Sequence, residues 1–556
     1  MRGGRALAGV LCATILMAAC TGTTVSAPTG EPTTYPTGAP ATPSAPTREP
    51  ELHDYDFGKV ELDGGNKKAN FPIRGIVAVP AASSAAPVAV VLHLAGLPCT
   101  DRTEQLPCKD GLDARFDKGM TWLATALAAH GYVVIAPDLT KTRDFRYETV
   151  TVPLGWKLAN ESLKRLRADP AAFGIPSDVD VSGTTVLVGH SVGGDNAMWW
   201  AVERPADIAA VVLLQPAPLQ PGLFPPPASP YAYPNEAPKT HQIPLGLPFA
   251  VLMGRCDDDA GYSGGLYIVN ATVDPERTAT TVTAILPTAD HLMFNTRALR
   301  TTSPPQAGCP DPSSTAHRAE SEATRAAIGA WTANVLTVFL DPALGSGALA
   351  RAAGIDISSP GTIEGMPDAS VIVAPAATKR TTVLLPMGGA LGVDGPGGRD
   401  VDGPSAGAET GVTYDVVGLT SMLCTSGGVV PIHSKGREPC TSENAERPGF
   451  GPALHLRPTS SEGTWTATLP TPVAGDLLLT ISADPTDPPA RVQVSAGGAT
   501  TEVDGSALAV PTAGRMASDR TIPRQIRIPL AAPVSSISVT VDGGAVFLQD
   551  VMIAPN

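Results

Sequence analysis

The feature that most constrains the fold is a strand that runs into the pentapeptide G-H-S-V-G, residues 189–193. Residues 184–188 before it are typical of a strand, and residues 196–203 after it are typical of a helix. On so sharp a strand-to-helix turn the backbone is strained, and only glycine fits two residues to either side of the serine. The pattern predicts that the turn lifts the Ser191 hydroxyl above the edge of a sheet, beside the N–H groups of the helix start.

A carboxylate and a histidine complete the catalytic triad of such a serine, and here both follow it along the chain. Asp257 comes directly after a short apolar strand, residues 249–254, which gives its carboxylate a rigid support for orienting an imidazole. Asp259 is the alternative acid, because spacing does not resolve a run of three aspartates. A solvated acidic loop or a calcium site would fit the same run.

His291 is the expected general base, because it follows the next strand, residues 281–286, and so faces the serine turn. Of the nine histidines, it alone fits both the chain order and the strand end. His93 and His190 flank the expected oxyanion and serine turns, and we expect them to shape the backbone rather than to transfer protons.

An oxyanion is stabilised by backbone N–H donors, and Val192 would supply one from the helix start. The second donor is expected after the apolar strand over residues 88–94. The turn there resembles the H-G-x turn of many esterases, but Leu94 stands where that pattern has glycine, so either Leu94 or Ala95 would donate. A plain buried strand with a turn is the alternative interpretation.

Residues 57–340 therefore resemble an α/β-hydrolase, and most of all the secreted bacterial esterases related to dienelactone hydrolases and cutinase-like polyester hydrolases. Beyond the triad, His291, Phe294 and Asn295 in A-D-H-L-M-F-N resemble the G-A-N-H-x-F-x motif of that group. The resemblance implies hydrolysis of a small-molecule or polymeric ester through an acyl-serine intermediate, without a cofactor. It does not fix the acyl group or the alcohol.

Strands and helices alternate over residues 51–345, which predicts an α/β fold with a mostly parallel sheet covered by helices on both faces. Helices are expected over residues 121–130, 157–168 and 319–340. A proline-dense segment, residues 215–247, falls between two of the strands. We expect it to form a lid or substrate wall over the serine, and a passive surface loop is the alternative.

The N-terminus predicts export. Residues 1–19 combine two arginines with an apolar stretch too short to span a membrane, and small residues precede Cys20 as in a bacterial lipobox. Cleavage before Cys20 would leave a lipid anchor at the outer face of the bacterial cell membrane; an ordinary signal peptide and a secreted protein are the alternative. Residues 20–50 are rich in Thr and Pro, so we expect a disordered tether.

A chain of 556 residues is too long for one hydrophobic core. After about residue 361 the pattern changes to short β-strand runs separated by turn residues. We expect a linker over residues 346–365 and an all-β sandwich over residues 366–556. Residues 536–553 resemble the closing strands of galactose-binding-like jelly rolls. Binding of cell-envelope carbohydrate is one hypothesis for this domain, and a structural spacer or packing partner is favoured because no sugar-contact motif is present.

Two of the eight cysteines, Cys12 and Cys20, lie in the leader, which leaves six in the exported chain. An even number of cysteines in an exported protein predicts disulfides. Sequence proximity favours the pairs Cys99–Cys108, Cys256–Cys309 and Cys424–Cys440. The second pair would tie the support of Asp257 to the loop after His291. Zinc binding is rejected, because the spacings lack paired C-x-x-C ligands.

The formal net charge of −14 argues against a nucleic-acid partner, since phosphates require basic grooves. We expect a monomer that needs neither a metal nor a cofactor. Two functional hypotheses follow: a serine esterase, and a catalytically idle hydrolase scaffold that serves as a surface binding protein through its β domain. The presence of all three chemical groups at strand ends favours the first.

Overall fold

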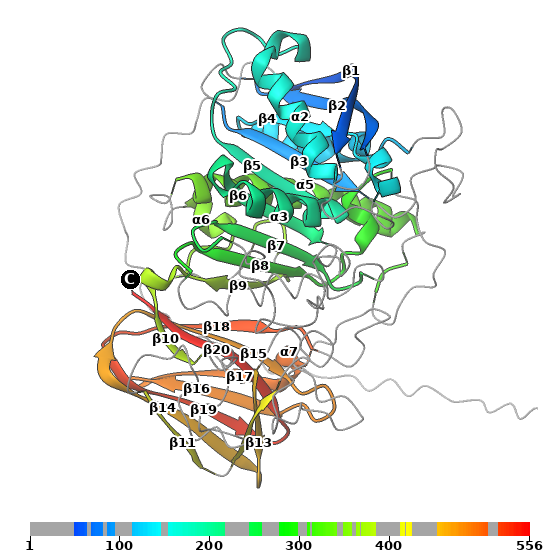
Figure 1. Cartoon of the computed structure of the whole chain (residues 1–556). Helices are drawn as coiled ribbons and strands as arrows, with labels where there is room; N and C mark the ends of the chain where they lie inside the picture. Colours follow the sequence, from blue (N-terminus) through cyan, green and yellow to red (C-terminus); the bar gives the residue numbers. More distant parts are fainter. Residues whose placement is uncertain are drawn as a thin grey trace, which may run out of the picture. The chain divides into compact units, whose positions relative to one another are not determined.

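Three β-sheets organise the part of the chain that the structure describes (Figure 1). The computed structural model describes residues 49–63, 68–81, 86–94, 114–145, 154–216, 244–257, 277–297, 309–311, 314–341, 348–357, 363–366, 368–384, 412–417, 419–424, 453–509 and 521–555. These residues belong to one compact unit, Pro46–Asn556. The expected signal peptide, the Cys20 anchor and nearly all of the tether lie outside them. No helix in the described ranges combines the length and apolar character needed to cross a bilayer.

The first sheet has nine strands with a parallel centre. In spatial order they are β1 (Glu51–Asp63), β2 (Lys68–Val79), β4 (Val133–Pro137), β3 (Val88–Leu94), β5 (Thr185–Ser191), β6 (Ile208–Pro216), β7 (Phe249–Gly254), β8 (Thr281–Leu286) and β9 (Ser370–Ala374). Neighbours from β4 to β8 are parallel, whereas β1, β2 and β9 pair antiparallel. The carboxyl ends of six adjacent strands therefore meet at one edge of this mixed sheet.

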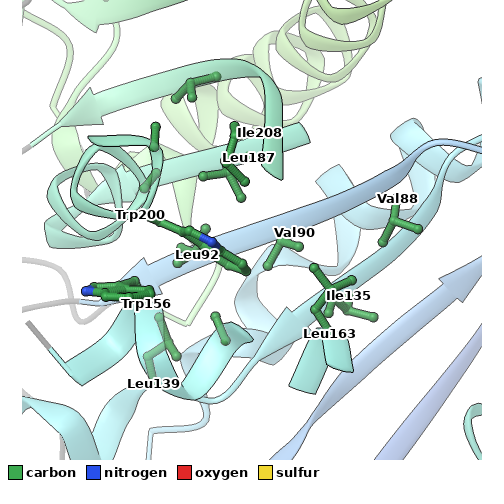
Figure 2. Close-up of a cluster of buried hydrophobic side chains, with 14 of the residues drawn as sticks. Val88, Val90, Leu92, Ile135, Leu139, Trp156, Leu163, Leu187, Trp200 and Ile208 are labelled. Atoms are coloured by element: carbon green, nitrogen blue, oxygen red, sulfur yellow. The ribbon is translucent and has the colours of Figure 1, made fainter. Parts of the chain in front are cut away.

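Helices cover both faces of the sheet. They include α1 (Thr121–Ala129), α2 (Leu154–Ala168), α3 (Val192–Glu203) and α5 (Thr315–Leu340). Successive residues of a strand point to opposite faces, so Val90 and Leu92 of β3 join the core under α2 and α3, while Val91 joins the core under α1 and α5. Figure 2 shows the first of these cores, with Trp156 and Trp200 beside Leu92. Burial on both faces explains why the central strands are apolar without interruption.

The α/β part continues further along the chain than the sequence indicated. The expected linker contains α6 (Ala348–Ala352), and Trp331 of α5 donates its indole N–H to the carbonyl oxygen of Ala353 at 3.0 Å. Residues 370–374, expected in the β domain, form β9 at the edge of the nine-stranded sheet. A short apolar strand carries no local signal of the sheet it joins, so the expected boundary at residue 366 differs from the pairing observed.

Two antiparallel sheets follow, as the alternating pattern predicted. In spatial order, one sheet contains β12 (Leu419–Cys424), β13 (Ala453–Pro458), β20 (Val546–Ala554), β15 (Asp476–Ala483) and β18 (Arg524–Pro529), and β10 (Thr381–Leu384) also pairs with β20. The other sheet contains β11 (Thr413–Val417), β14 (Glu462–Val473), β19 (Val534–Asp542), β16 (Arg491–Ala496) and β17 (Ala499–Asp504). Trp465 and Val539 of one sheet share a core with Leu479 and Leu548 of the other. The likeness to jelly rolls stays a prediction.

We expect Trp331→Ala to lower the free energy of unfolding by about 3–5 kcal/mol, because the fully buried indole would leave a cavity. Trp331→Phe keeps an aromatic ring but loses the hydrogen bond to Ala353. It should therefore lower the free energy of unfolding by less than the Ala variant does, about 1–2 kcal/mol. Urea unfolding followed by circular dichroism measures both. Val417→Ala, at a site 63% exposed, serves as the control with a change within about 0.5 kcal/mol. A negligible loss in the Ala variant would contradict the packing of α5 described here.

Candidate active site

Ser191 occupies the sharp turn between β5 and α3. It is the N-cap residue of α3 and has a positive φ of 55°, which is uncommon for a residue with a side chain. A Cβ atom at Gly193 would collide with the carbonyl group of Leu92 in β3, and a Cβ atom at Gly189 would collide with the backbone of Gly194. Both glycines are therefore required by the close approach of the helix to the strands.

Three side chains from separate strand ends meet at this turn. Nε2 of His291 lies 2.9 Å from Oγ of Ser191, and Nδ1 of His291 lies 2.7 Å from Oδ2 of Asp257. All three side chains are buried: His291 is 3% exposed, Ser191 is 5% exposed and Asp257 is 1% exposed. Asp257 is thus the candidate acid that the structure brings to His291, while Asp259 lies outside the described residues.

The arrangement is suited to proton transfer. A carboxylate only accepts hydrogen bonds, so Nδ1 of His291 donates to Asp257 and Nε2 is left to accept the proton of Ser191. Asp257 would then stabilise the imidazolium that forms. Among the described residues, no three His, Cys, Asp or Glu side chains are grouped so that they could hold a metal ion.

The loop that carries Asp257 is fixed by its neighbours in the sheet. Gln215, at the end of β6, is fully buried with a positive φ of 42°, and its side-chain oxygen accepts the backbone N–H of Gly254. The backbone N–H of Cys256 donates to the carbonyl oxygen of Ala289 at 2.9 Å. Gln215 was not among the site residues predicted from the sequence, and its one signal is that it is a polar residue at the end of an apolar strand.

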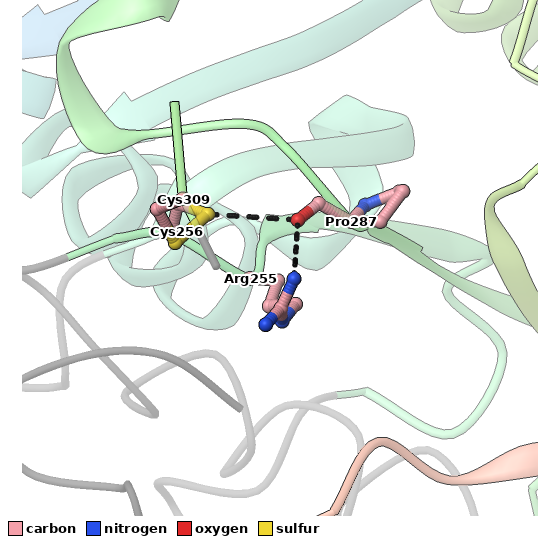
Figure 3. Close-up of a disulfide and its surroundings, with 4 residues drawn as sticks. All are labelled: Arg255, Cys256, Pro287 and Cys309. Atoms are coloured by element: carbon pink, nitrogen blue, oxygen red, sulfur yellow. Dashed lines mark hydrogen bonds between the residues drawn. A yellow bond between two sulfur atoms is a disulfide. The ribbon is translucent and has the colours of Figure 1, made fainter. Parts of the chain in front are cut away.

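A disulfide joins Cys256 to Cys309, with 5.8 Å between their Cα atoms (Figure 3). Sγ of Cys256 contacts the carbonyl oxygen of Pro287 at 3.5 Å, and the guanidinium of Arg255 donates to the same oxygen at 3.4 Å. Because Pro287 follows β8, these contacts tie the end of β7 to the end of β8. The other two expected pairs involve residues outside the described ranges: Cys99, Cys108 and Cys440.

The loop that carries His291 forms a 3-10 helix, η8 (His291–Phe294). Oδ1 of Asp290 accepts the backbone N–H of Met293 at 2.7 Å and so caps this helix. The side-chain amide of Asn295 donates to the carbonyl oxygen of Phe116 at 2.9 Å. The indole N–H of Trp122 donates to the carbonyl oxygen of Phe294 at 3.2 Å. The residues that follow His291 therefore anchor its loop to the start of α1 and to the 3-10 helix η1 (Phe116–Met120) just before it.

His93 and His190 form a buried pair next to the site. Their Nδ1 atoms lie 2.7 Å apart and their rings stack with centroids 4.8 Å apart. Nε2 of His190 lies 3.1 Å from the carbonyl oxygen of His291. Burial, with a smaller contribution from His291, lowers the pKa of His93 to about 3. Burial and the neighbouring imidazoles also lower the pKa of His190 well below its usual range, so both rings are neutral at pH 7.

The candidate oxyanion donors lie at the same sheet edge. Leu94, the last residue of β3, pairs in register with Ser191. Val192 is the first residue of α3, where backbone N–H groups have no acceptor within the helix. Ala95 lies outside the described residues, so the choice between Leu94 and Ala95 stays open.

Only the ends of the expected lid, residues 215–247, are described. Gln215 and Pro216 belong to β6, and Leu247 is buried in the core under α2 and α3. These ends are parts of the α/β core, so the segment expected to cover the serine is shorter than predicted. The lid itself stays a prediction.

No family model and no curated protein matches the sequence. Among solved structures, a hyperthermophilic esterase from the archaeon Pyrobaculum calidifontis is similar over 51% of this chain and 86% of that chain, with 18% sequence identity and a TM-score of 0.32. A likeness at this TM-score decides neither the fold nor the activity.

Loss of the disulfide should lower the free energy of unfolding by about 4 kcal/mol, because it closes a loop with a sequence separation of 53 residues. We expect Cys309→Ser and the double substitution Cys256→Ser/Cys309→Ser to lose the same amount, since each breaks the same bond. Urea unfolding with and without reductant, together with free-thiol titration, measures this. A midpoint unmoved by reductant would contradict a stabilising bond.

The neutral histidine pair should make stability depend on pH. Each ring has a folded pKa below the unfolded value of 6.5, so the unfolded state binds more protons and stability is lost as the pH falls below about 6.5. The slope should be about 1.4 kcal/mol per pH unit for each histidine. Urea unfolding between pH 7.5 and 5 measures it. In the His93→Gln variant the slope of stability against pH should be shallower by the contribution of one histidine. An unchanged slope would contradict burial of a neutral His93.

Proposed function

We propose that this protein is a serine hydrolase that cleaves carboxylic esters, of small molecules or polymers, through an acyl-serine intermediate. The observation that carries the proposal is the series of hydrogen bonds from Ser191 through His291 to Asp257, at 2.9 and 2.7 Å. These are the groups and contacts that activate a serine hydroxyl for attack on an acyl carbon.

The reaction would begin when Oγ of Ser191 attacks the ester carbonyl carbon and its proton passes to Nε2 of His291. The negative charge on the carbonyl oxygen would be held by the backbone N–H of Val192 and by that of Leu94 or Ala95. His291 would return the proton to the departing alcohol, which leaves the acyl group on Ser191. A water molecule would then attack the acyl carbon while His291 takes its proton; the bond from the acyl carbon to Oγ of Ser191 would break, and His291 would return the proton to Oγ as the acid leaves.

The topology supports assignment to the α/β-hydrolases, as the sequence resemblance implied. In that fold the nucleophile lies at a strand-to-helix turn, and the acid and the histidine follow it in this order. Here Ser191 is the last residue of β5, Asp257 follows β7 and His291 follows β8, within one set of parallel neighbours. The likeness to dienelactone hydrolases and cutinase-like polyester hydrolases is part of this proposal.

We also propose that the enzyme works outside the cytoplasm as a monomer. The disulfide between Cys256 and Cys309 supports an oxidising compartment, in agreement with the leader over residues 1–19. Lipid on Cys20 would attach the protein to the outer face of the bacterial membrane, with residues 20–50 as a tether; simple secretion is the alternative. Cell-envelope carbohydrate is a candidate partner of the two antiparallel sheets, and a role as structural spacer or packing partner is favoured.

A fluorophosphonate probe should label Ser191, and the protein should hydrolyse p-nitrophenyl esters. Ser191→Ala should abolish both, because the nucleophile is gone. Asp257→Asn should lower kcat by about 10⁴-fold, because the amide no longer holds the imidazole in the tautomer that accepts the serine proton. Labelling followed by peptide mass spectrometry, and initial rates at saturating ester, measure these effects.

The control for these variants is a second buried histidine–aspartate pair. Nε2 of His455 lies 3.1 Å from Oδ2 of Asp484 in the β part of the chain. His455→Gln should leave kcat per folded molecule unchanged. A protein that takes no label and cleaves no ester of any acyl length, although folded, would contradict the proposed function.

A further inference from the structure

The reaction proposed above makes no use of two buried histidines beside the site. His190 lies on β5 directly before Ser191, and His93 lies on β3, where parallel pairing places it in register with His190. They are only 1% and 3% exposed. A buried imidazole is costly unless its polar atoms are hydrogen bonded, so the partners of the two rings indicate what the rings do.

The hydrogen bonds determine where the protons lie. Nε2 of His190 is 3.1 Å from the carbonyl oxygen of His291, which only accepts, so this nitrogen carries a hydrogen. Since the ring is neutral, Nδ1 of His190 is an acceptor, and Nδ1 of His93, at 2.7 Å, must donate to it. The two rings therefore form a neutral chain of donors that ends on the main chain of His291.

His291 is thus held from two sides by consecutive residues of one strand. Successive strand residues point to opposite faces, so the side chains of His190 and Ser191 leave β5 in different directions. Ser191 contacts the His291 imidazole, whereas His190 contacts the His291 carbonyl group. The His190 ring also packs on the rings of His291 and Phe294, with centroids 5.0 and 5.2 Å away. Backbone and side chain of the base are fixed relative to the same strand as the nucleophile.

We propose that His190, with its tautomer set by His93, is a positioning residue that fixes the main chain of His291 and so keeps the imidazole within reach of Ser191. The inference rests on the proposed function for its catalytic consequence. Nε2 of His93 is buried without a hydrogen-bond partner in the described part of the chain, so His93 acts through Nδ1 alone. Without that donor, the His190 proton would be free to move to Nδ1, and the bond to His291 would be lost.

The kinetic test compares two substitutions at one position. His190→Leu removes the donor and should lower kcat by about 10- to 100-fold through misplacement of the base, with KM within about twofold. His190→Gln keeps a side-chain N–H near the position of Nε2 and should restore kcat to within about fivefold of the unsubstituted protein. His130→Leu, at the exposed end of α1, is the matched control and should leave kcat unchanged.

A second measurement does not depend on activity or on whether the Leu variant folds. Nitrogen-15 histidine spectra of the unsubstituted protein, assigned with His93→Gln and His190→Gln, should show His190 protonated on Nε2 and His93 on Nδ1. Both rings should stay neutral from pH 7 to pH 5, because burial disfavours their charged forms.

Equal kcat losses in the Leu and Gln variants, or full kcat in the Leu variant, would overturn the positioning role. An active protein in which His190 carries its proton on Nδ1 would overturn this inference and leave the proposed function standing. An inert protein that shows the expected tautomers would overturn the proposed function and leave the hydrogen-bond assignment standing.

Discussion

The close approach of α3 to strands β3 and β5 is the constraint on which the site depends. Gly193 lies against the carbonyl group of Leu92, and Gly189 lies against Gly194, so no side chain fits at either position. This approach forces Ser191 into a positive φ and turns its hydroxyl towards the carboxyl edge of the sheet. It also keeps β3 next to β5, and therefore keeps His93 next to His190.

The base, His291, is restrained at three of its atoms. His291 has one contact at each ring nitrogen and a third at its carbonyl oxygen, and these come from Ser191, Asp257 and His190. In a buried site such bonds are strong when complete and costly when one is missing. The disulfide at Cys256 and the cap from Asp290 restrain the two supporting loops further. Stability and positioning of the base thus come from the same contacts.

Much of the α/β part could be predicted from local pattern. The strands over residues 88–94, 249–254 and 281–286 have the predicted bounds, because each is an apolar run buried on both faces and closed by a turn. β1 was missed, since most of its residues are partly or fully exposed and the pattern is weak. β9 was assigned to the wrong part of the chain, because its sheet partner is β8, about ninety residues earlier.

The sequence by itself determined the residue types at the strand ends and their order along the chain: Ser191, then the aspartates from Asp257, then His291. Local strand and turn signals are sufficient for this, because they mark where each strand reaches the sheet edge. The tertiary structure confirmed two contacts that the sequence could only favour, Asp257 with His291 and Cys256 with Cys309, and it alone showed that His93 pairs with His190. These contacts join residues 34, 53 and 97 positions apart. Their partners depend on which strands lie side by side, and no local pattern encodes that.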